Sequence, residues 1–275
     1  MWIAIFVILF LLLAYLFLIM PRIFGKADMD SLNTDYAHRG LWNEQYPENS
    51  LAAFARAASV GYGIELDVQL SKDKRIMVFH DATLKRMCGV DGKLSDYTCE
   101  ELQKMKLLGS EYTIPTFVDV LRTVNGRVPL LVELKGETTN TELCKRIAPV
   151  LDKYRGQFCV ESFNPFLLAW FKKYRPRYAR GQLVTKMTHK TENRNAFVNF
   201  VLSNMLTNVL SRPDFIATGK NIRNTPMIYI CESVFRSNVF VWTVNQKEEY
   251  VTCRKEGRHA IFEKILPKTE RKKMS

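Results

Sequence analysis

The strongest constraint on the fold is an alternation that starts at residue 35 and continues through most of the chain. Short β-branched or apolar runs that end in polar residues give way, one after another, to stretches with helical periodicity. A strand followed by a crossover helix pairs in parallel with the next strand, and eight such units predict an α/β fold, the closed (β/α)8 TIM barrel. The predicted strands are residues 36–38, 63–68, 128–133, 158–162, 179–183, 215–217, 238–243 and 260–262.

Helical patterns lie between these strands, and one apolar run breaks the rhythm. Residues 75–80 follow the second strand after a link of residues 71–74, which is too short for a crossover helix. We expect this run to form a hairpin that returns His80 to the rim of the barrel. The predicted helices are residues 49–59, 97–106, 116–124, 141–153, 165–174, 193–210, 225–235 and 247–256.

An uncharged apolar run at residues 2–20 precedes the barrel. As a helix it would be roughly 28 Å long, close to the thickness of a bilayer's hydrocarbon core. A cleaved signal peptide is the alternative, but no Lys or Arg precedes the run and no small-residue cleavage site follows it. The run therefore favours an uncleaved transmembrane helix.

The chain is thus expected to have four parts. Residues 2–20 form the transmembrane helix, 21–34 a juxtamembrane linker, 35–267 the barrel domain and 268–275 a basic tail. Arg22 and Lys26 follow the apolar run, so the positive-inside tendency predicts a single-pass protein of the cell membrane with a cytoplasmic barrel. Six scattered cysteines without a C-x-x-C pair indicate free thiols in a reducing compartment.

The charge balance bears on partners. Forty basic against 28 acidic residues give a formal net charge of +12, which favours a membrane surface, a phosphorylated substrate or nucleic acid. The basic segment 172–180 resembles a nucleic-acid patch, but it joins a helix to the next strand on the face opposite the reactive end. We expect solvated surface there and no nucleic-acid partner. The sequence gives no basis for an oligomeric state.

Three carboxylates fall at strand ends, where the reactive side chains of such barrels cluster. Glu65 and Asp67 share one face of a strand, and Glu133 ends the strand predicted next to it. Buried carboxylates need a counter-charge, and an all-oxygen set suits Ca²⁺ or Mg²⁺. Ion pairing with Arg39 and Lys135 is the alternative.

Two of the four histidines, His38 and His80, also terminate strands at this end, whereas His189 and His259 lie outside the cluster. Phosphodiester cleavage needs one group to deprotonate the attacking oxygen and another to protonate the leaving oxygen. Arg39 and Lys135 are placed to hold phosphate oxygens. We therefore predict a metal-dependent phosphodiester hydrolase with His38 and His80 as its acid–base pair.

Six ordered motifs between about residues 36 and 263 resemble those of the glycerophosphodiester phosphodiesterase family. They are Ala37-His38-Arg39-Gly40, Pro47-Glu48-Asn49-Ser50, Glu65-Leu66-Asp67-Val68, His80-Asp81, Glu133-Leu134-Lys135 and Trp242-Thr243-Val244-Asn245. A single His-Arg-Gly would be weak evidence, but six motifs in the right order are specific. The last strand departs from the family pattern because it ends in Phe262-Glu263-Lys264 rather than in an acidic residue after a threonine.

The resemblance implies a TIM-barrel hydrolase that cuts glycerophosphodiesters into glycerol 3-phosphate and an alcohol. It makes His38 and His80 the acid–base pair, with Ca²⁺ or Mg²⁺ bound, and Trp242 a wall of the pocket beside the glycerol or the leaving group. The implied metal ligands are Glu65, Asp67 and Glu133, and the implied phosphate contacts are Arg39 and Lys135. Attack by water and attack by the glycerol's own hydroxyl, through a cyclic phosphate, both remain open.

Two further functions stay in view. The tether and the apolar segment 196–210 favour a phosphodiesterase that cleaves lysophospholipids or phospholipids, if that segment dips into the membrane rather than packing on the barrel. The other function is a catalytically silent, membrane-tethered binder of anionic glycerol phosphates.

Overall fold

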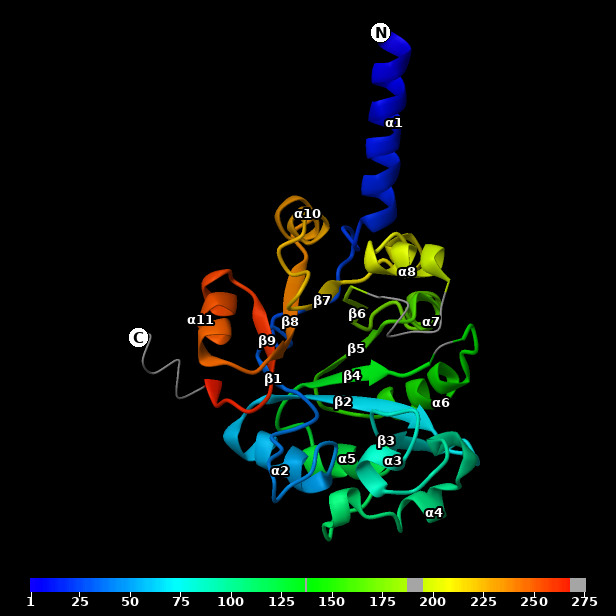
Figure 1. Cartoon of the computed structure of the whole chain (residues 1–275), viewed down its shortest axis with the longest axis vertical. Helices are drawn as coiled ribbons and strands as arrows, with labels where there is room; N and C mark the ends of the chain where they lie inside the picture. The colour runs from blue at the N-terminus through cyan, green and yellow to red at the C-terminus, as the bar shows by residue number, and fades with distance from the viewer. Residues whose placement is uncertain (137, 187–194, 268–275) are drawn as a thin grey trace.

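The computed structural model describes residues 1–136, 138–186 and 195–267. Within these residues, eight parallel strands close into a barrel in which β1 pairs with both β2 and β9 (Figure 1). The (β/α)8 prediction is therefore confirmed. The parallel strands are β1 (Tyr36–Ala37), β2 (Gly63–Leu70), β4 (Leu130–Leu134), β5 (Phe158–Ser162), β6 (Arg180–Val184), β7 (Phe215–Gly219), β8 (Asn238–Val244) and β9 (His259–Phe262).

Helices cover the outside of the barrel, and several of them begin at a residue whose side chain caps the first turn. Ser50 accepts a hydrogen bond from the Ala53 amide at the start of α2, and Gly61 ends this helix in a left-handed conformation. The outer helices are α2 (Leu51–Val60), α5 (Phe117–Val124), α6 (Glu142–Leu151), α7 (Pro165–Tyr174), α8 (Ala196–Ser203), α9 (Asn208–Ser211), α10 (Pro226–Tyr229) and α11 (Lys247–Lys255).

The hairpin is also confirmed, because β3 (Ile76–Val78) pairs antiparallel with the end of β2. The helix predicted at residues 97–106 is wrong. Only α4 (Cys99–Leu102) forms there, since the Thr98 and Glu101 capping box starts a helix that ends after one turn. Together with α3 (Lys85–Cys88), this segment folds around its own small core, which contains Met77, Phe79, Leu84, Leu94, Leu102 and Ile114.

Two other predicted helices are interrupted. Residues 193 and 194 lie outside the described residues, and the remainder of the 193–210 helix divides into α8 and α9 around Met205, whose φ is +53°. The helix predicted at 225–235 is α10 followed by a π-helical turn at Ile230–Val234. Both breaks occur in the part of the barrel that lies nearest the N-terminal helix (Figure 1).

Alternation along the strands separates two layers of core. On β4, Val132 packs with the outer helices, whereas Leu131 lies in the barrel interior. Glu133 follows Leu131 by two residues, so its carboxylate points into the upper end of the same interior. The interior is thus apolar at its base and acidic at the carboxyl ends of the strands.

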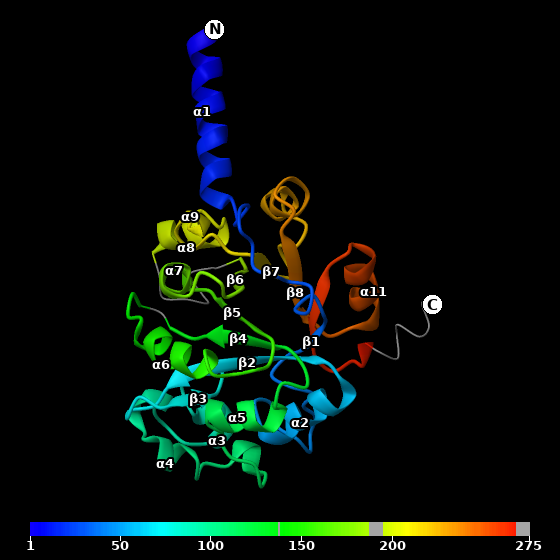
Figure 2. The same cartoon turned by 180° about the vertical axis from the view of Figure 1, so that it is seen from behind.

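The N-terminal helix α1 (Trp2–Ile19) stands away from the barrel in both views (Figures 1 and 2). By length and composition it can cross a membrane, a test that a signal sequence also passes. Its last turn is held by the barrel, because Asn208 donates a hydrogen bond to the Ile19 carbonyl and Arg212 donates to the carbonyls of Phe17 and Met20. Segment 21–34 then packs against the apolar core inside the barrel, in which Met29 and Leu32 are buried.

Candidate active site

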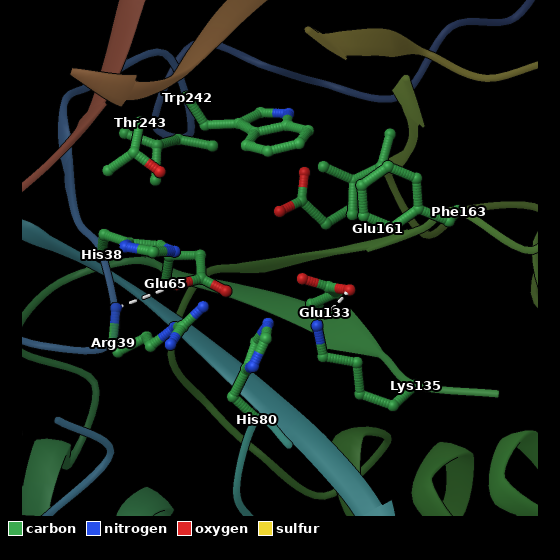
Figure 3. Close-up of a pocket in the computed structure, with 12 residues that line it drawn as sticks. His38, Arg39, Glu65, His80, Glu133, Lys135, Glu161, Phe163, Trp242 and Thr243 are labelled. Atoms are coloured by element: carbon green, nitrogen blue, oxygen red, sulfur yellow. Dashed lines mark hydrogen bonds and ion pairs between the residues drawn. The ribbon is translucent and has the colours of Figure 1, made fainter. Parts of the chain in front are cut away.

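One pocket at the carboxyl ends of the strands gathers the predicted site residues (Figure 3). Its volume is about 90 Å³, and Asp67, which contacts the lining residues Arg39 and Lys135, is buried with 1% of its surface exposed. His38 and Thr243 lie on one side, Glu161 and Phe163 on the other (Figure 3). Seven of the eight predicted residues line it, namely His38, Arg39, Glu65, His80, Glu133, Lys135 and Trp242.

The three predicted metal ligands converge. Glu65, Asp67 and Glu133 each offer an oxygen atom, these atoms lie within 4.8 Å of one another, and all three residues are buried. Asp67 and Glu133 are paired positions on neighbouring strands, so the sheet register itself sets them side by side. Such a set of hard oxygen donors is the kind that Ca²⁺ and Mg²⁺ prefer.

The pKa values of these carboxyl groups reflect crowding. Burial, and then the charges of Asp67 and Glu133, hold the pKa of Glu65 well above its usual range. Burial also raises the pKa of Glu133 to about 7. For Asp67, burial is outweighed by the nearby positive charges of Lys135, His80 and Arg39, and the pKa falls. Of the three carboxyl groups, Asp67 is therefore the one that ionises most readily.

Both cationic side chains of the pocket are paired with acidic groups. The ion pairs that were expected as the alternative to metal binding are therefore present. Nζ of Lys135 lies 2.6 Å from Oε1 of Glu133 and 2.9 Å from Oδ1 of Asp67. Nη1 of Arg39 lies 2.7 Å from Oε1 of Glu48, and its Nε lies 3.5 Å from Oδ2 of Asp67. Burial alone would lower the pKa of Lys135, but these two carboxylates raise it, so the ammonium is charged.

Glu161, which the sequence reasoning missed, adds a fourth carboxyl group. It is the β5 neighbour of Glu133 in the sheet register and is 1% exposed, and its Oε2 has no hydrogen-bond partner among the described residues. Burial and the charges of Glu65 and Glu133 raise its pKa well above the usual range. Its alternation with Cys159 repeats that of Glu133 with Leu131. This spacing predicts that the Glu161 side chain also points into the barrel, and it is the sequence feature from which the residue could have been identified.

The excess of buried acidic groups in the pocket favours a bound cation. Glu65, Asp67, Glu133 and Glu161 are four acidic groups, and they share the two pocket cations, one of which also pairs with Glu48. A divalent cation bound by Glu65, Asp67 and Glu133 would offset negative charge in this buried set. The residues present therefore fit a metal site.

Each pocket histidine is held by a carboxylate. Nδ1 of His38 lies 3.0 Å from Oε2 of Glu263, and Nδ1 of His80 lies 2.7 Å from Oδ1 of Asp81. A carboxylate at Nδ1 favours the proton on that nitrogen and leaves Nε2 available for proton exchange. The hydrogen bond to His38 lowers the pKa of Glu263. Glu263 belongs to the run Phe262-Glu263-Lys264, in which the last strand departs from the family pattern.

A network of ion pairs connects the two sides of the site. Arg86 of α3 lies 2.6 Å from Oδ2 of Asp81 and 2.7 Å from Oε1 of Glu48, the same oxygen that contacts Arg39. Asn49 donates a hydrogen bond of 2.9 Å to Asp67. The motifs contained Glu48, Asn49 and Asp81, but their positioning roles were not recognised, because they depend on contacts between separate segments.

The apolar wall of the pocket is Trp242, whose Nε1 donates to the Ala217 carbonyl at 3.1 Å. Its ring meets Phe163 edge to face, with centroids 5.6 Å apart. His259 begins β9, lies 3.1 Å from Arg254 and is not part of the pocket. His189 lies outside the described residues.

The prediction that segment 172–180 is solvated surface is wrong at one residue. Arg175 is partly exposed and pairs with Asp152 at 2.7 Å. Arg180, in contrast, is not solvated: it is 2% exposed and lies 3.7 Å from the carboxylate of Asp214. Its place in the β6 strand, with its side chain directed toward α9, accounts for the burial, since it donates to the Ser211 carbonyl.

The chain is similar in sequence to known proteins. YhdW of Bacillus subtilis is 31% identical over 228 residues, which span 77% of this chain and 86% of that protein. The glycerophosphodiester phosphodiesterase of Bacillus altitudinis is 34% identical over 169 residues, or 57% of this chain and 69% of the relative.

Solved structures share the fold. A glycerophosphodiester phosphodiesterase from Thermotoga maritima has 29% identity and a TM-score of 0.65, covering 83% of this chain and 94% of its own. An Oleispira antarctica phosphodiesterase, solved with the product sn-glycerol-3-phosphate, has 24% identity and a TM-score of 0.69, covering 84% and 92%. The family model for glycerophosphoryl diester phosphodiesterases matches residues 38–263, and the chain belongs to this family.

Proposed function

We propose that the protein hydrolyses glycerophosphodiesters to glycerol 3-phosphate and an alcohol. The observation that carries the proposal is the pair of carboxylate-held histidines, His38 and His80, which share one pocket with two cations and a buried acidic cage. Family membership and relatives that carry this activity in their names support the same substrate class.

The histidines would carry the protons of the reaction. A phosphodiester is cleaved when an oxygen attacks phosphorus and the alcohol oxygen leaves, so one base and one acid are needed. His38 and His80 provide both roles through Nε2, because Glu263 and Asp81 occupy the Nδ1 atoms. Burial lowers the pKa of His80, which favours the neutral ring that can accept a proton.

The remaining pocket residues would bind and orient the diester. Arg39 and Lys135 hold phosphate oxygens by charge-assisted hydrogen bonds, and Trp242 packs against the glycerol or the leaving group. Glu65, Asp67 and Glu133 would hold a divalent cation, Ca²⁺ or Mg²⁺. When bound, that cation supplies Lewis-acid polarisation of the phosphate.

We also propose a single-pass membrane protein with a cytoplasmic barrel. The length of α1 supports the anchor, and Arg22 and Lys26 support the orientation. All six cysteines are free, in keeping with a reducing compartment.

A substrate panel tests the activity. Glycerol 3-phosphate release is measured from glycerophosphocholine, glycerophosphoethanolamine and glycerophosphoglycerol after treatment with chelator and after addition of Ca²⁺ or Mg²⁺. We expect release that chelator abolishes and one of the two cations restores. Binding of glycerophosphocholine without turnover under all of these conditions would instead identify a catalytically silent binding protein.

A further inference from the structure

The N-terminal helix α1 is free of the barrel over only part of its length. Residues 2–13 are exposed, whereas Ile19 is fully buried and Tyr15 packs against the core between the strands and the outer helices. At 1.5 Å per residue the exposed part is about 18 Å long, well short of the roughly 30 Å of a bilayer's hydrocarbon core. If α1 crosses a bilayer, residues 14–19, about 9 Å of helix, must therefore also lie in the hydrocarbon layer.

Two segments of the barrel reach this depth because they hold the end of α1. The Ile19 carbonyl accepts a hydrogen bond from Asn208 of α9 and one from Cys231 of the π-helical turn, whose Sγ lies 3.7 Å away. Arg212, which follows α9, places its guanidinium over the Phe17 ring, 4.5 Å from the ring centroid. Both views show α8 and α10 at the end of the molecule from which α1 emerges (Figures 1 and 2).

The same part of the barrel carries large apolar side chains on its surface. Phe197 and Phe200 of α8 are 71% and 58% exposed. Tyr229 of α10 and Val234 of the π-helical turn are 64% and 63% exposed, and Phe24, which follows α1, is 85% exposed. Such a concentration of apolar surface is costly in water, and beside the exit of an apolar helix the partner that it fits is lipid.

Basic side chains accompany these apolar groups. Lys172 donates to a backbone carbonyl of α9, Lys26 to the carbonyl that follows the π-helical turn, and Arg212 to the carbonyl at the end of α1. A backbone carbonyl orients an ammonium or guanidinium group but does not neutralise its charge. Apolar and basic groups side by side suit a bilayer that contains anionic lipids, because the acyl chains take the apolar groups and the phosphates take the charges.

We propose that the surface of residues 196–211 and 226–234, here called the membrane collar, is immersed in the leaflet that faces the barrel. The inference rests on the proposed membrane anchor and goes beyond it, because the barrel itself becomes part of the membrane interface. The apolar side chains of the collar would lie at a depth of about 5–10 Å, and the basic ones would extend back to the head groups. The collar would thus fix the orientation of the barrel on the bilayer, which a tether alone does not.

Fluorescence quenching of the full chain in nanodiscs of phosphatidylcholine and phosphatidylglycerol tests the immersion. Phe200→Cys and Tyr229→Cys are each labelled with a fluorophore in a Cys88→Ser background, because Cys88 is half-buried and the other five cysteines are buried. Nitroxides on the acyl chains quench a label in the bilayer, and iodide quenches a label in water. We expect nitroxide quenching of both collar labels to exceed that of a control label about twofold or more, and iodide quenching to be weaker.

The matched control is Leu108→Cys. Leu108 is 63% exposed and follows Leu107 of the small core around α3 and α4, at the end of the molecule farthest from α1 (Figures 1 and 2). Ile8→Cys, at a position of α1 that is 66% exposed, reports on the anchor itself.

Two results would overturn the collar, and they are distinguishable. If nitroxides quench the Ile8 label but the collar labels behave like the Leu108 label, α1 crosses a locally thinned bilayer and the anchor stands without the collar. If iodide alone quenches the Ile8 label, the anchor is wrong and the collar falls with it.

Discussion

Nδ1 of His38 lies 3.0 Å from Oε2 of Glu263, although 225 residues separate them in the chain. Because β1 pairs with β9, closure of the barrel brings the first strand end and the last one together. The same relation recurs across the pocket between His80 and Asp81, which are adjacent in sequence. The site thus has two imidazoles, each oriented by its own carboxylate.

Replacing Glu263 by Gln should lower kcat about 10- to 100-fold, the range seen when a carboxylate that orients a metal-bound histidine is removed. The amide can present its NH₂ to Nδ1 and so select the wrong tautomer of His38. Steady-state kinetics on glycerophosphocholine check this, with Glu263→Asp as the conservative comparison. An unchanged kcat in Glu263→Gln would show that His38 needs no orienting partner.

The roles of His38 and His80 can be distinguished with two substrates whose leaving groups differ in their need for protonation. His38→Ala and His80→Ala should each lower kcat about 10²- to 10⁴-fold on a choline diester. A nitrophenyl diester needs no protonation of its leaving oxygen, so the variant that lacks the acid should recover most of its activity on that substrate. The variant that lacks the base should not. Equal losses on both substrates in both variants would contradict the acid–base assignment.

Metal affinity should depend on pH through Glu133. Burial raises its pKa in the metal-free protein to about 7, so below that pH a bound cation must displace a proton. Affinity for Ca²⁺ or Mg²⁺ should therefore fall as pH drops below 7, by about tenfold per pH unit for each proton that the cation displaces. Calorimetry in two buffers of different ionisation enthalpy measures both the affinity and the released proton.

The same shift predicts how the cation affects stability. A carboxyl group whose pKa is raised by folding stabilises the metal-free protein below about pH 4.5, the pKa of the unfolded chain. This stabilisation is lost as the pH rises toward 7. The bound cation should therefore raise the melting temperature more at pH 8 than at pH 6. Glu133→Gln should remove this difference, and its persistence in that variant would assign the effect to another group.

Arg86 should act on catalysis without touching substrate, since it does not line the pocket but contacts Asp81 and Glu48. Removing it with Arg86→Met frees the carboxylates that hold His80 and Arg39. We expect kcat to fall with little change in KM, and a partial return of kcat in Arg86→Lys. A change confined to KM would mean that Arg86 instead contacts the substrate.

The sequence identified the barrel and most of the pocket because both depend on local patterns. Strand ends are readable from polarity, so the site residues at the ends of β1 and β4 were found, and Glu65 and Asp67 were found within β2, which continues to Leu70. Glu161 was missed because its neighbour Ser162, rather than an acidic residue, ends its strand. Glu263 was recognised only as a departure, since its contact with His38 exists only after the barrel closes. Only α4 forms in the predicted helix 97–106, because the capping box of Thr98 and Glu101 stabilises the first turn and does not extend the helix beyond it.

Membrane orientation is testable with a single introduced thiol. Five native cysteines are buried and Cys88 is half-buried, so a Cys88→Ser background leaves little reactive thiol. Glu100→Cys, on the exposed surface of α4, should resist a membrane-impermeant maleimide in intact cells and react after permeabilisation, because the barrel is proposed to be cytoplasmic. Trp2→Cys, at the far end of α1, should show the opposite pattern. Labelling of Glu100→Cys in intact cells would reverse the orientation, and a purified chain whose mass lacks α1 would identify a cleaved signal peptide.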